Sequence, residues 1–240
     1  MEIIESITNK KIVEWCKLKT KKYRDITNMF IVEGKHLVIE AYKSGCLKYV
    51  LTLDDEEYEN VITYKVNESI LKKLSSLVTT PRIIGIVCKK DEEPIGNKVL
   101  VLDNIQDPGN LGTIIRSAVA FNIDTIVLSK NSVDLYNEKV IQSTQGNMFY
   151  INIVSKDLIG FLNIIKGEYK IISTDVNKGK DITNFKNDKK YAIIMGNEGN
   201  GVSEEIKNMA DDFMYIKTSD NCESLNVAVA SSIIMYELSK

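Results

Sequence analysis

The C-terminal part of the chain alternates short apolar runs with longer segments whose hydrophobic residues recur at helical spacing. The apolar runs predict buried strands at residues 99–102, 125–128, 150–154, 169–173, 191–195 and 213–216. The segments between them predict helices at residues 110–121, 137–144, 158–165, 204–209 and 225–238. This alternation predicts an α/β domain with a mainly parallel sheet covered by helices on both faces. Such sheets bind ligands in loops beyond the carboxyl ends of their strands.

The N-terminal part shows a looser version of the same alternation. It predicts a basic helix at about residues 9–22, strands at 30–34, 49–52 and 83–88, and helices at 35–44 and 67–76. Residues 91–97 interrupt the pattern because they are polar and contain Pro94 and Gly96, which is typical of a linker. We therefore expect two domains, a small α/β unit at residues 1–93 and a larger one at residues 97–240.

Composition and charge narrow the class of protein. The chain is 44% hydrophobic and 27% charged, as in ordinary globular proteins, and it lacks both a secretory signal and an apolar run long enough to cross a bilayer. We therefore expect a cytoplasmic protein with no membrane partner. The net charge is only −2, but five of the eight residues 17–24 are Lys or Arg. They predict either a phosphate-facing patch or a solvated helix face, and charge alone does not decide between the two.

The residue types present argue against a metal site and against a Ser-His-Asp catalytic triad. The four cysteines are scattered, and His36 is the only histidine. A zinc site needs clustered ligands, so we expect no metal and reduced cysteines. His36 begins an expected helix, which favours a solvated or capping histidine over a catalytic base.

A first polar cluster follows the strand at residues 99–102. Pro108-Gly109 predicts a turn, and Asn110 is placed to cap the next helix. Arg116 adds a guanidinium suited to bidentate recognition of phosphate. From spacing alone, a helix cap followed by a surface charge is the slightly better explanation of these residues.

A second cluster, at residues 196–203, follows the strand at residues 191–195. Its three glycines suit tight turns and close approach of the backbone to a ligand. It is neither a Walker A loop nor the dinucleotide fingerprint. Glu198 within the loop argues against phosphate and favours a neutral or cationic ligand. A mere tight connection is the alternative.

A third cluster opens the last helix. Ser224 is expected to cap that helix, and small residues at positions 228 and 230–232 leave one side of it slim. Another backbone, from this chain or from a partner subunit, could approach there closely.

Together and in this order, the three clusters resemble the motifs of the SpoU (TrmH-like) family of RNA ribose 2′-O-methyltransferases, within the SPOUT class. The matching strings are residues 107–116, 195–202 and 224–230. More loosely, residues 28–34 look like the family's ribosomal-protein-like substrate-binding domain. The resemblance implies a trefoil-knot fold for the C-terminal α/β domain, S-adenosyl-L-methionine as cofactor, RNA as substrate, and a homodimer with the site at its interface.

The resemblance also assigns roles to residues. Asn110 and Arg116 match the pair of the first motif, Glu198 the acid of the second, and Ser224 and Asn226 the polar residues of the third. Cofactor contacts are implied at Thr174, Met195, Gly196, Asn197, Gly201, Ile216, Thr218 and Leu225. A guanidinium with a pKa above about 12 is a poor base. We therefore hypothesise that Arg116 holds the phosphate beside the reacting ribose and stabilises developing negative charge.

Three positions depart from the family pattern. Gln142 and Gln145 stand where relatives more often have arginine and methionine, which predicts altered RNA contacts, and Lys217 stands where proline is common. The N-terminal domain favours structured ribosomal RNA as substrate, with transfer RNA as the alternative. A non-catalytic RNA-binding protein on the same scaffold is a further alternative, although it predicts damaged motifs. A nucleotide-dependent α/β enzyme would need a phosphate loop that the sequence lacks.

Overall fold

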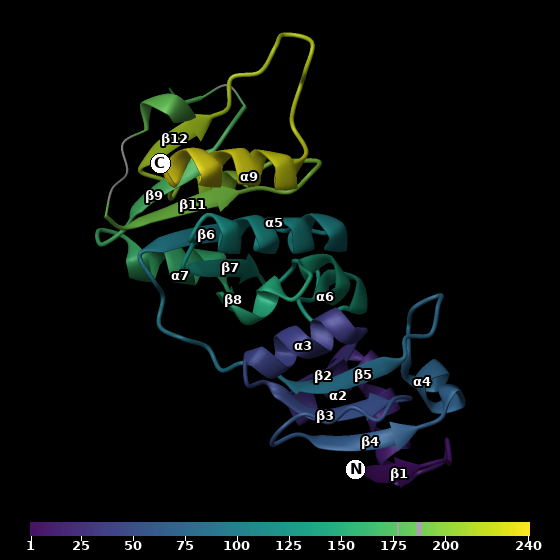
Figure 1. Cartoon of the computed structure of the whole chain (residues 1–240). Coiled ribbons are helices and arrows are strands. Elements are labelled where there is room, and N and C mark those ends of the chain that lie inside the picture. The colour runs from purple at the N-terminus through teal and green to yellow at the C-terminus, as the bar shows by residue number, and fades with distance from the viewer. Residues whose placement is uncertain (177, 186–188) are drawn as a thin grey trace. The chain divides into compact units, whose positions relative to one another are not determined.

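The computed structural model describes residues 1–176, 178–185 and 189–240, which form two compact units (Figure 1). The first unit comprises Met1–Asp91 and Asp134–Tyr150, and the second comprises Glu92–Val133 and Ile151–Lys240. The chain therefore passes from one unit to the other three times. Among the helices in the described ranges, none is long and apolar enough to cross a membrane.

The first unit is built on a mixed sheet in the order β1-β4-β3-β5-β2. Its strands are β1 (Glu2–Ile4), β2 (Met29–Glu33), β3 (Leu47–Thr52), β4 (Ile62–Val66) and β5 (Ile83–Cys88). β5 runs antiparallel to β2 and β3, whereas β4 runs parallel to β1 and β3. β1 and β4 are missing from the predicted pattern. β1 is too short to show periodicity, and the polar residues Thr63 and Lys65 interrupt the apolar run of β4.

Helices α1 (Lys10–Cys16) and α4 (Glu68–Leu74) share a hydrophobic core with this sheet, and α3 (Lys35–Lys43) packs on β2, β3 and β5. The expected basic helix at residues 9–22 is instead divided into α1, a 3₁₀ turn at Lys17–Lys19 and α2 (Lys21–Thr27). Thr20 adopts an extended conformation, and this ends the first helical stretch. Asn9 caps α1 by accepting from the Lys11 amide.

The segment at residues 134–150 packs within the first unit, although it lies inside the range 97–240 expected for the C-terminal domain. It contains α6 (Glu138–Thr144) and a 3₁₀ turn at Asn147–Phe149. Asp134 accepts from Arg24 at 2.5 Å, Phe149 stacks on Phe30, and Tyr150 donates to Glu40 at 2.5 Å. These ionic and aromatic contacts are the physical reason for the difference, since they join residues more than a hundred positions apart.

Three residues singled out in the sequence make contacts within the first unit. The Arg24 side chain is buried and donates to Asp134 and to the Leu18 and Lys19 carbonyls, so it does not face phosphate. Gln142 donates to the Glu33 carbonyl at 3.1 Å, which makes it an internal packing residue of the first unit. His36 is exposed, and its Nε2 lies 3.1 Å from the Gln145 carbonyl oxygen.

The second unit is built on a parallel sheet in the order β10-β12-β9-β11-β6-β7-β8 (Figure 1). Its strands are β6 (Lys98–Leu102), β7 (Thr125–Ser129), β8 (Asn152–Lys156), β9 (Lys170–Thr174), β10 (Lys180–Asp181), β11 (Tyr191–Met195) and β12 (Asp212–Tyr215). All its pairings are parallel in the described residues, as the apolar runs predicted. β6 and β11 are central neighbours, with Leu102 paired to Met195.

Helices cover both faces of this sheet. One face packs on α7 (Leu158–Ile165) and α8 (Glu204–Lys207) in a core that includes Val101 of β6 and Ile194 of β11. On the other side, α5 (Pro108–Ala120) and α9 (Val227–Leu238) pack against each other (Figure 1). A hydrogen bond of 2.7 Å between Ser117 and Ser232 joins these two helices. The small residues expected to leave α9 slim therefore receive a helix of the same chain.

Candidate active site

The candidate site lies beyond the carboxyl ends of β6 and β11. Because these strands are paired in parallel, the loops that follow them begin side by side. The Asp103 amide donates to the Met195 carbonyl at 2.9 Å, and the Ser203 amide donates to the buried Asp103 carboxylate at 2.9 Å. These bonds fix the start of the first cluster against both ends of the second.

The first cluster forms the N-terminus of α5, but its cap is Asp107 rather than the expected Asn110. The Asp107 carboxylate accepts from the Asn110 amide at 2.7 Å, and Pro108 occupies the first helical turn. Aspartate followed by proline is a favourable start for a helix, so the sequence did carry this signal. Because Asp107 serves as the cap, the Asn110 side chain is available for other contacts.

The Asn110 side chain joins the second and third clusters. Its Nδ2 donates to Glu198 Oε1 at 2.9 Å, and its Oδ1 accepts from Asn226 Nδ2 at 3.0 Å. The Asp107 amide also points to Glu198 Oε1, at 3.4 Å. Both ends of the Asn110 amide are thus occupied, which fixes its orientation. Three of the five predicted catalytic residues therefore form one hydrogen-bonded row.

The second cluster is a tight loop closed by its own backbone. Asn197 and Gly201 exchange two amide-to-carbonyl hydrogen bonds of 2.9 Å, and Gly201 has a φ of +68°. A Cβ on Gly196 would lie 2.0 Å from the backbone of Gly201 and Val202, so this position requires glycine. The Asn197 side chain donates to the Asn104 carbonyl at 2.8 Å, which ties the loop to the residues after β6. The carboxylate of Glu198 projects from a rigid support.

The third cluster forms the N-terminus of α9, and the cap is Asn226 rather than the expected Ser224. Asn226 Oδ1 accepts from the amides of Ala228 and Val229 at 2.9 and 3.3 Å. The helix accordingly begins at Val227, two residues later than predicted. Ser224 lies in the preceding loop with its side chain exposed, and its carbonyl accepts from the Cys222 thiol at 3.4 Å. Asn226 therefore combines capping with the bond to Asn110.

The residues expected to contact a cofactor fall into three places. Met195, Gly196, Asn197 and Gly201 belong to the tight loop after β11. Thr174 ends the neighbouring strand β9, where its hydroxyl donates to the Ile194 carbonyl at 2.9 Å. Ile216, Thr218 and Leu225 lie in the segment between β12 and α9, together with Lys217, and Thr218 donates to the Cys222 carbonyl at 3.5 Å. All three places follow carboxyl ends of strands in the sheet.

Arg116 stands apart from the hydrogen-bonded row. It lies on α5 with its side chain exposed, and within the described residues it forms no hydrogen bond or ion pair. A charged fork that is free of protein partners can accept a phosphate without first breaking an internal bond. Ser224 is likewise exposed and outside the row.

Sequence reasoning missed three residues that build this site. Asp103, Asn104 and Asp107 fix the two loops to each other through the bonds described above. All three follow directly on strand β6. The left-handed φ of +62° at Asn104 fits an asparagine at a sharp turn.

Comparisons with known proteins agree with this arrangement. Residues 97–236 match the SpoU rRNA Methylase family, and residues 9–85 match an MRM3-like substrate binding domain. The Bacillus subtilis 23S rRNA (guanosine(2553)-2'-O)-methyltransferase RlmP is 38% identical over 247 residues, covering 99% of both chains. The mouse (Mus musculus) mitochondrial rRNA methyltransferase 3 is 33% identical over 157 residues, covering 58% of this chain and 38% of that protein.

Solved structures show the same likeness. The crystal structure of an AdoMet-bound rRNA methyltransferase from Sinorhizobium meliloti has a TM-score of 0.87 at 26% identity, covering 99% of this chain and 97% of that one. The SpoU methyltransferase AviRb from Streptomyces viridochromogenes, in complex with AdoMet, has a TM-score of 0.85 at 21% identity, covering 96% and 97%. The second likeness shows the fold alone.

Proposed function

Because the chain belongs to the SpoU rRNA methylase family, we propose that it transfers a methyl group from S-adenosyl-L-methionine to a ribose 2′-hydroxyl of ribosomal RNA. The observation that carries the proposal is the row formed by Glu198, Asn110 and Asn226. It brings three segments that are distant in sequence to one edge of the sheet. Each segment contributes polar side chains of the kind that position a substrate and a cationic donor.

The residues of two segments, the glycine-rich loop after β11 and the segment between β12 and α9, fit such a cofactor. Gly196 lets the backbone of the loop after β11 close on Gly201 and Val202, which fixes the shape of the loop. Asn197, Thr218 and the backbone near Leu225 offer neutral polar groups, and Glu198 offers the negative charge that a sulfonium favours. When bound, S-adenosyl-L-methionine supplies an electrophilic methyl group. The loop after β11 and the segment between β12 and α9 would hold the cofactor and exclude water around it.

Arg116 acts on the RNA side of the reaction, and Asn110 acts through Glu198. The free guanidinium of Arg116 binds the phosphate next to the reacting ribose and stabilises negative charge as the hydroxyl oxygen attacks. The proton leaves through that phosphate, because a guanidinium remains protonated. Asn110, held at both ends of its amide, fixes Glu198 relative to α5. Correct placement of oxygen and methyl is worth several kcal/mol in reactions of this type.

The two domains then divide the work. Residues 1–93 form the RNA substrate-binding domain, which the match at residues 9–85 supports. Residues 97–240 form the methyltransferase domain, except that their segment 134–150 packs within the first unit. The C-terminal segment is threaded as a trefoil knot, and the enzyme is a homodimer that works in the cytoplasm without a metal.

Exposed apolar side chains on α9 support the dimer. The side chains of Val229, Ile233 and Tyr236 on this helix are 36–51% exposed.

Methyl transfer from labelled S-adenosyl-L-methionine tests the proposal directly. Ribosomal RNA and transfer RNA prepared from cells lacking the gene are offered separately, and ribose methylation is mapped at nucleotide resolution. We expect label in ribosomal RNA at one 2′-hydroxyl, and loss of the label with Arg116→Ala. Label found only in transfer RNA would refute the substrate assignment. Cofactor binding without transfer to either RNA would refute the proposed activity.

A further inference from the structure

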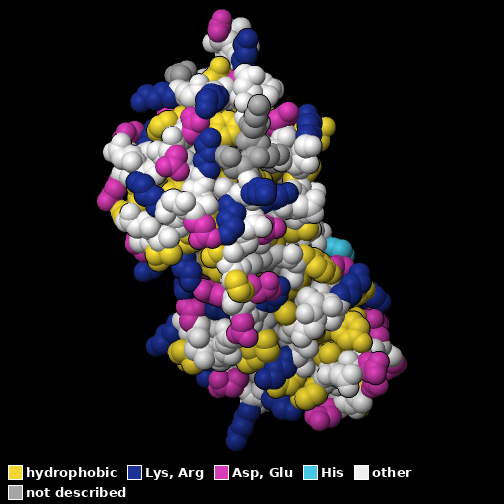
Figure 2. Space-filling model, turned by 90° about the vertical axis from the view of Figure 1, so that its left-hand side faces the viewer, with side chains coloured by type: hydrophobic (Ala, Val, Ile, Leu, Met, Phe, Trp, Pro, Cys, Tyr) yellow, Lys and Arg dark blue, Asp and Glu magenta, His cyan; other side chains and the backbone are white. Residues whose placement is uncertain are grey.

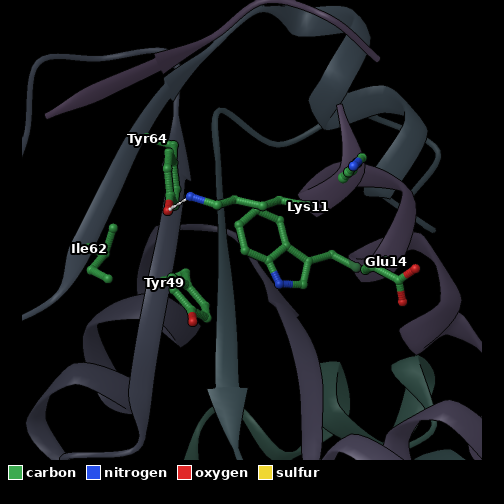
Figure 3. Close-up of a pocket in the computed structure, with 7 residues that line it drawn as sticks. Lys11, Glu14, Tyr49, Ile62 and Tyr64 are labelled. Atoms are coloured by element: carbon green, nitrogen blue, oxygen red, sulfur yellow. Dashed lines mark hydrogen bonds between the residues drawn. The ribbon is translucent and has the colours of Figure 1, made fainter. Parts of the chain in front are cut away.

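A cavity of about 350 Å³ lies in the first unit, between helix α1 and the strands β3 and β4. Its lining residues are Lys10, Lys11, Glu14, Trp15, Tyr49, Ile62 and Tyr64. In Figure 3 the Lys11 side chain reaches toward Tyr64, with Tyr49 and Ile62 on the strand side and Glu14 on the helix side. This cavity belongs to the N-terminal unit and takes no part in the site described above.

Aromatic rings form the floor of the cavity. The ring centroid of Trp15 lies 5.1 Å from that of Tyr49 and 5.7 Å from that of Tyr64. Trp15 and Tyr64 are buried, Tyr49 is half-buried, and Ile62 at the rim is 50% exposed. The accessible part therefore offers part of the Tyr49 ring and the aliphatic side chain of Ile62, and the buried Trp15 packs against Tyr49. Such a surface suits a flat unsaturated ring.

Positive charge borders this floor. Lys11 Nζ donates to the Tyr64 hydroxyl at 2.6 Å and lies 4.5 Å from the centre of that ring, and Lys48 Nζ lies 5.7 Å from the Tyr49 ring. The bond to Tyr64 raises the pKa of Lys11, so its ammonium group stays charged at neutral pH.

The acidic groups nearby are already engaged. Glu14 pairs with Lys17 at 2.6 Å, and Glu2 lies 3.7 Å from Lys11. Lys10 is exposed and forms no hydrogen bond or ion pair within the described residues. Once these pairs are formed, the net charge at the rim of the cavity is positive, and the floor of the cavity is apolar.

We propose that this cavity holds one unstacked nucleotide of the RNA, with its base on Tyr49 and Ile62, next to Trp15, and its phosphate on Lys10 and Lys48. The proposal rests on the proposed function, since it assigns part of the substrate to a place in the chain. Sequence-tolerant recognition of unpaired bases uses such aromatic platforms bordered by cations. On the face shown in Figure 2, basic and acidic side chains are interspersed.

Trp15 makes the proposal testable, because it is the only tryptophan in the chain. Its fluorescence reports on the cavity without any need for methyl transfer. A single-stranded hexanucleotide is titrated into the full-length protein, and the same oligonucleotide with abasic sites serves as the comparison. We expect saturable quenching by the first. The abasic oligonucleotide keeps the phosphates but lacks the bases, and we expect its affinity to be lower by about 5- to 100-fold.

Variants test which groups carry the binding. Lys10→Glu and Tyr49→Leu should each weaken binding of the hexanucleotide by about fivefold or more, whereas Tyr49→Phe should retain it. Lys72→Glu is the matched control, because Lys72 is an exposed lysine of the same unit outside the cavity. Thermal unfolding of each variant identifies any loss of fold, and Lys10→Glu, at an exposed position, keeps the test decisive if Tyr49→Leu unfolds.

The proposal would be overturned by equal affinity for the abasic oligonucleotide, or by equal weakening in Lys10→Glu and Lys72→Glu. Absence of quenching by either oligonucleotide would overturn it as well. Because Trp15 fluorescence is measured independently of methyl transfer, failure of this proposal can be distinguished from failure of the proposed function. Quenching without methyl transfer would leave the cavity assignment intact, and methyl transfer without quenching would leave the enzyme assignment intact.

Discussion

The side-chain amide of Asn226 donates to the side-chain oxygen of Asn110 over 3.0 Å, although 116 positions separate the two residues. Asn226 also caps α9, and Asn110 stands in the first turn of α5. The bond therefore connects the N-termini of two packed helices. A group bound at the N-terminus of one helix is therefore held in a fixed position relative to the N-terminus of the other helix.

Substitutions can separate the two roles of Asn226, the cap of α9 and the hydrogen bond to Asn110. Asn226→Asp keeps an oxygen for the cap but replaces the amide donor with a carboxylate that faces the Asn110 oxygen. We expect little change in stability and a fall in methyl transfer of about tenfold. Asn226→Ala should lose the cap as well, at about 1 kcal/mol. Asn67→Ala removes the cap of α4 in the first unit and should lower stability alone. Equal activity of Asn226→Asp and wild type would show that the bond has no role.

Glu198 offers a test of charge against hydrogen bonding. Glu198→Gln keeps an oxygen that accepts from Asn110, whereas Glu198→Ala leaves the Asn110 amide without that partner. We expect cofactor affinity to fall modestly in the first variant and by about tenfold or more in the second. Calorimetry with S-adenosyl-L-methionine measures both. Glu205→Ala, an exposed glutamate on α8, should bind like wild type, and identical losses in all three variants would argue against a local effect.

Arg116→Lys tests bidentate geometry at constant charge. Lysine cannot form the planar two-point contact with phosphate that arginine forms. We expect cofactor binding to be unchanged and turnover to fall by about tenfold or more, measured in single-turnover assays with saturating RNA. Turnover near that of wild type would mean that positive charge alone suffices.

Two glycines of one loop form a matched pair. A methyl group on Gly196 would lie 2.0 Å from the Gly201 backbone, whereas on Gly199 it would lie 3.5 Å from the Asn197 side chain. Gly196→Ala should lose cofactor binding and destabilise the protein by about 2–4 kcal/mol. Gly199→Ala should change stability by less than about 0.5 kcal/mol. Calorimetry and denaturant unfolding check both, and tolerance of Gly196→Ala would show that the loop can rearrange.

The ion pair of Arg24 and Asp134 is expected to stabilise the first unit. Arg24 is buried, so Arg24→Met leaves Asp134 and two carbonyl oxygens without their donor. We expect the free energy of unfolding to fall by about 3 kcal/mol. Arg82→Met breaks the exposed pair with Asp54 and should cost less than about 1 kcal/mol. Similar losses measured by urea unfolding would contradict a special role for the buried pair.

Much of the fold follows from local pattern. Strands β6 and β11 were predictable because both faces of each strand are apolar, and the order of the three motifs indicated the family. The caps were misplaced because the first and third clusters each contain two good cap residues. Only the turn geometry selects Asp107 over Asn110 and Asn226 over Ser224. The place of residues 134–150 depends on partners such as Arg24 and Phe30, which no local pattern can reveal.

The position of residues 134–150 has a consequence for how the protein is made. Synthesis proceeds from the N-terminus, so residues 1–91 emerge well before the segment that supplies the counter-ion of Arg24 and the ring that stacks on Phe30. The first unit cannot complete its packing until the chain has been extended through Tyr150. A fragment cut at the linker would therefore leave Arg24 without its carboxylate, and the native N-terminal unit is best produced with the remainder of the chain attached.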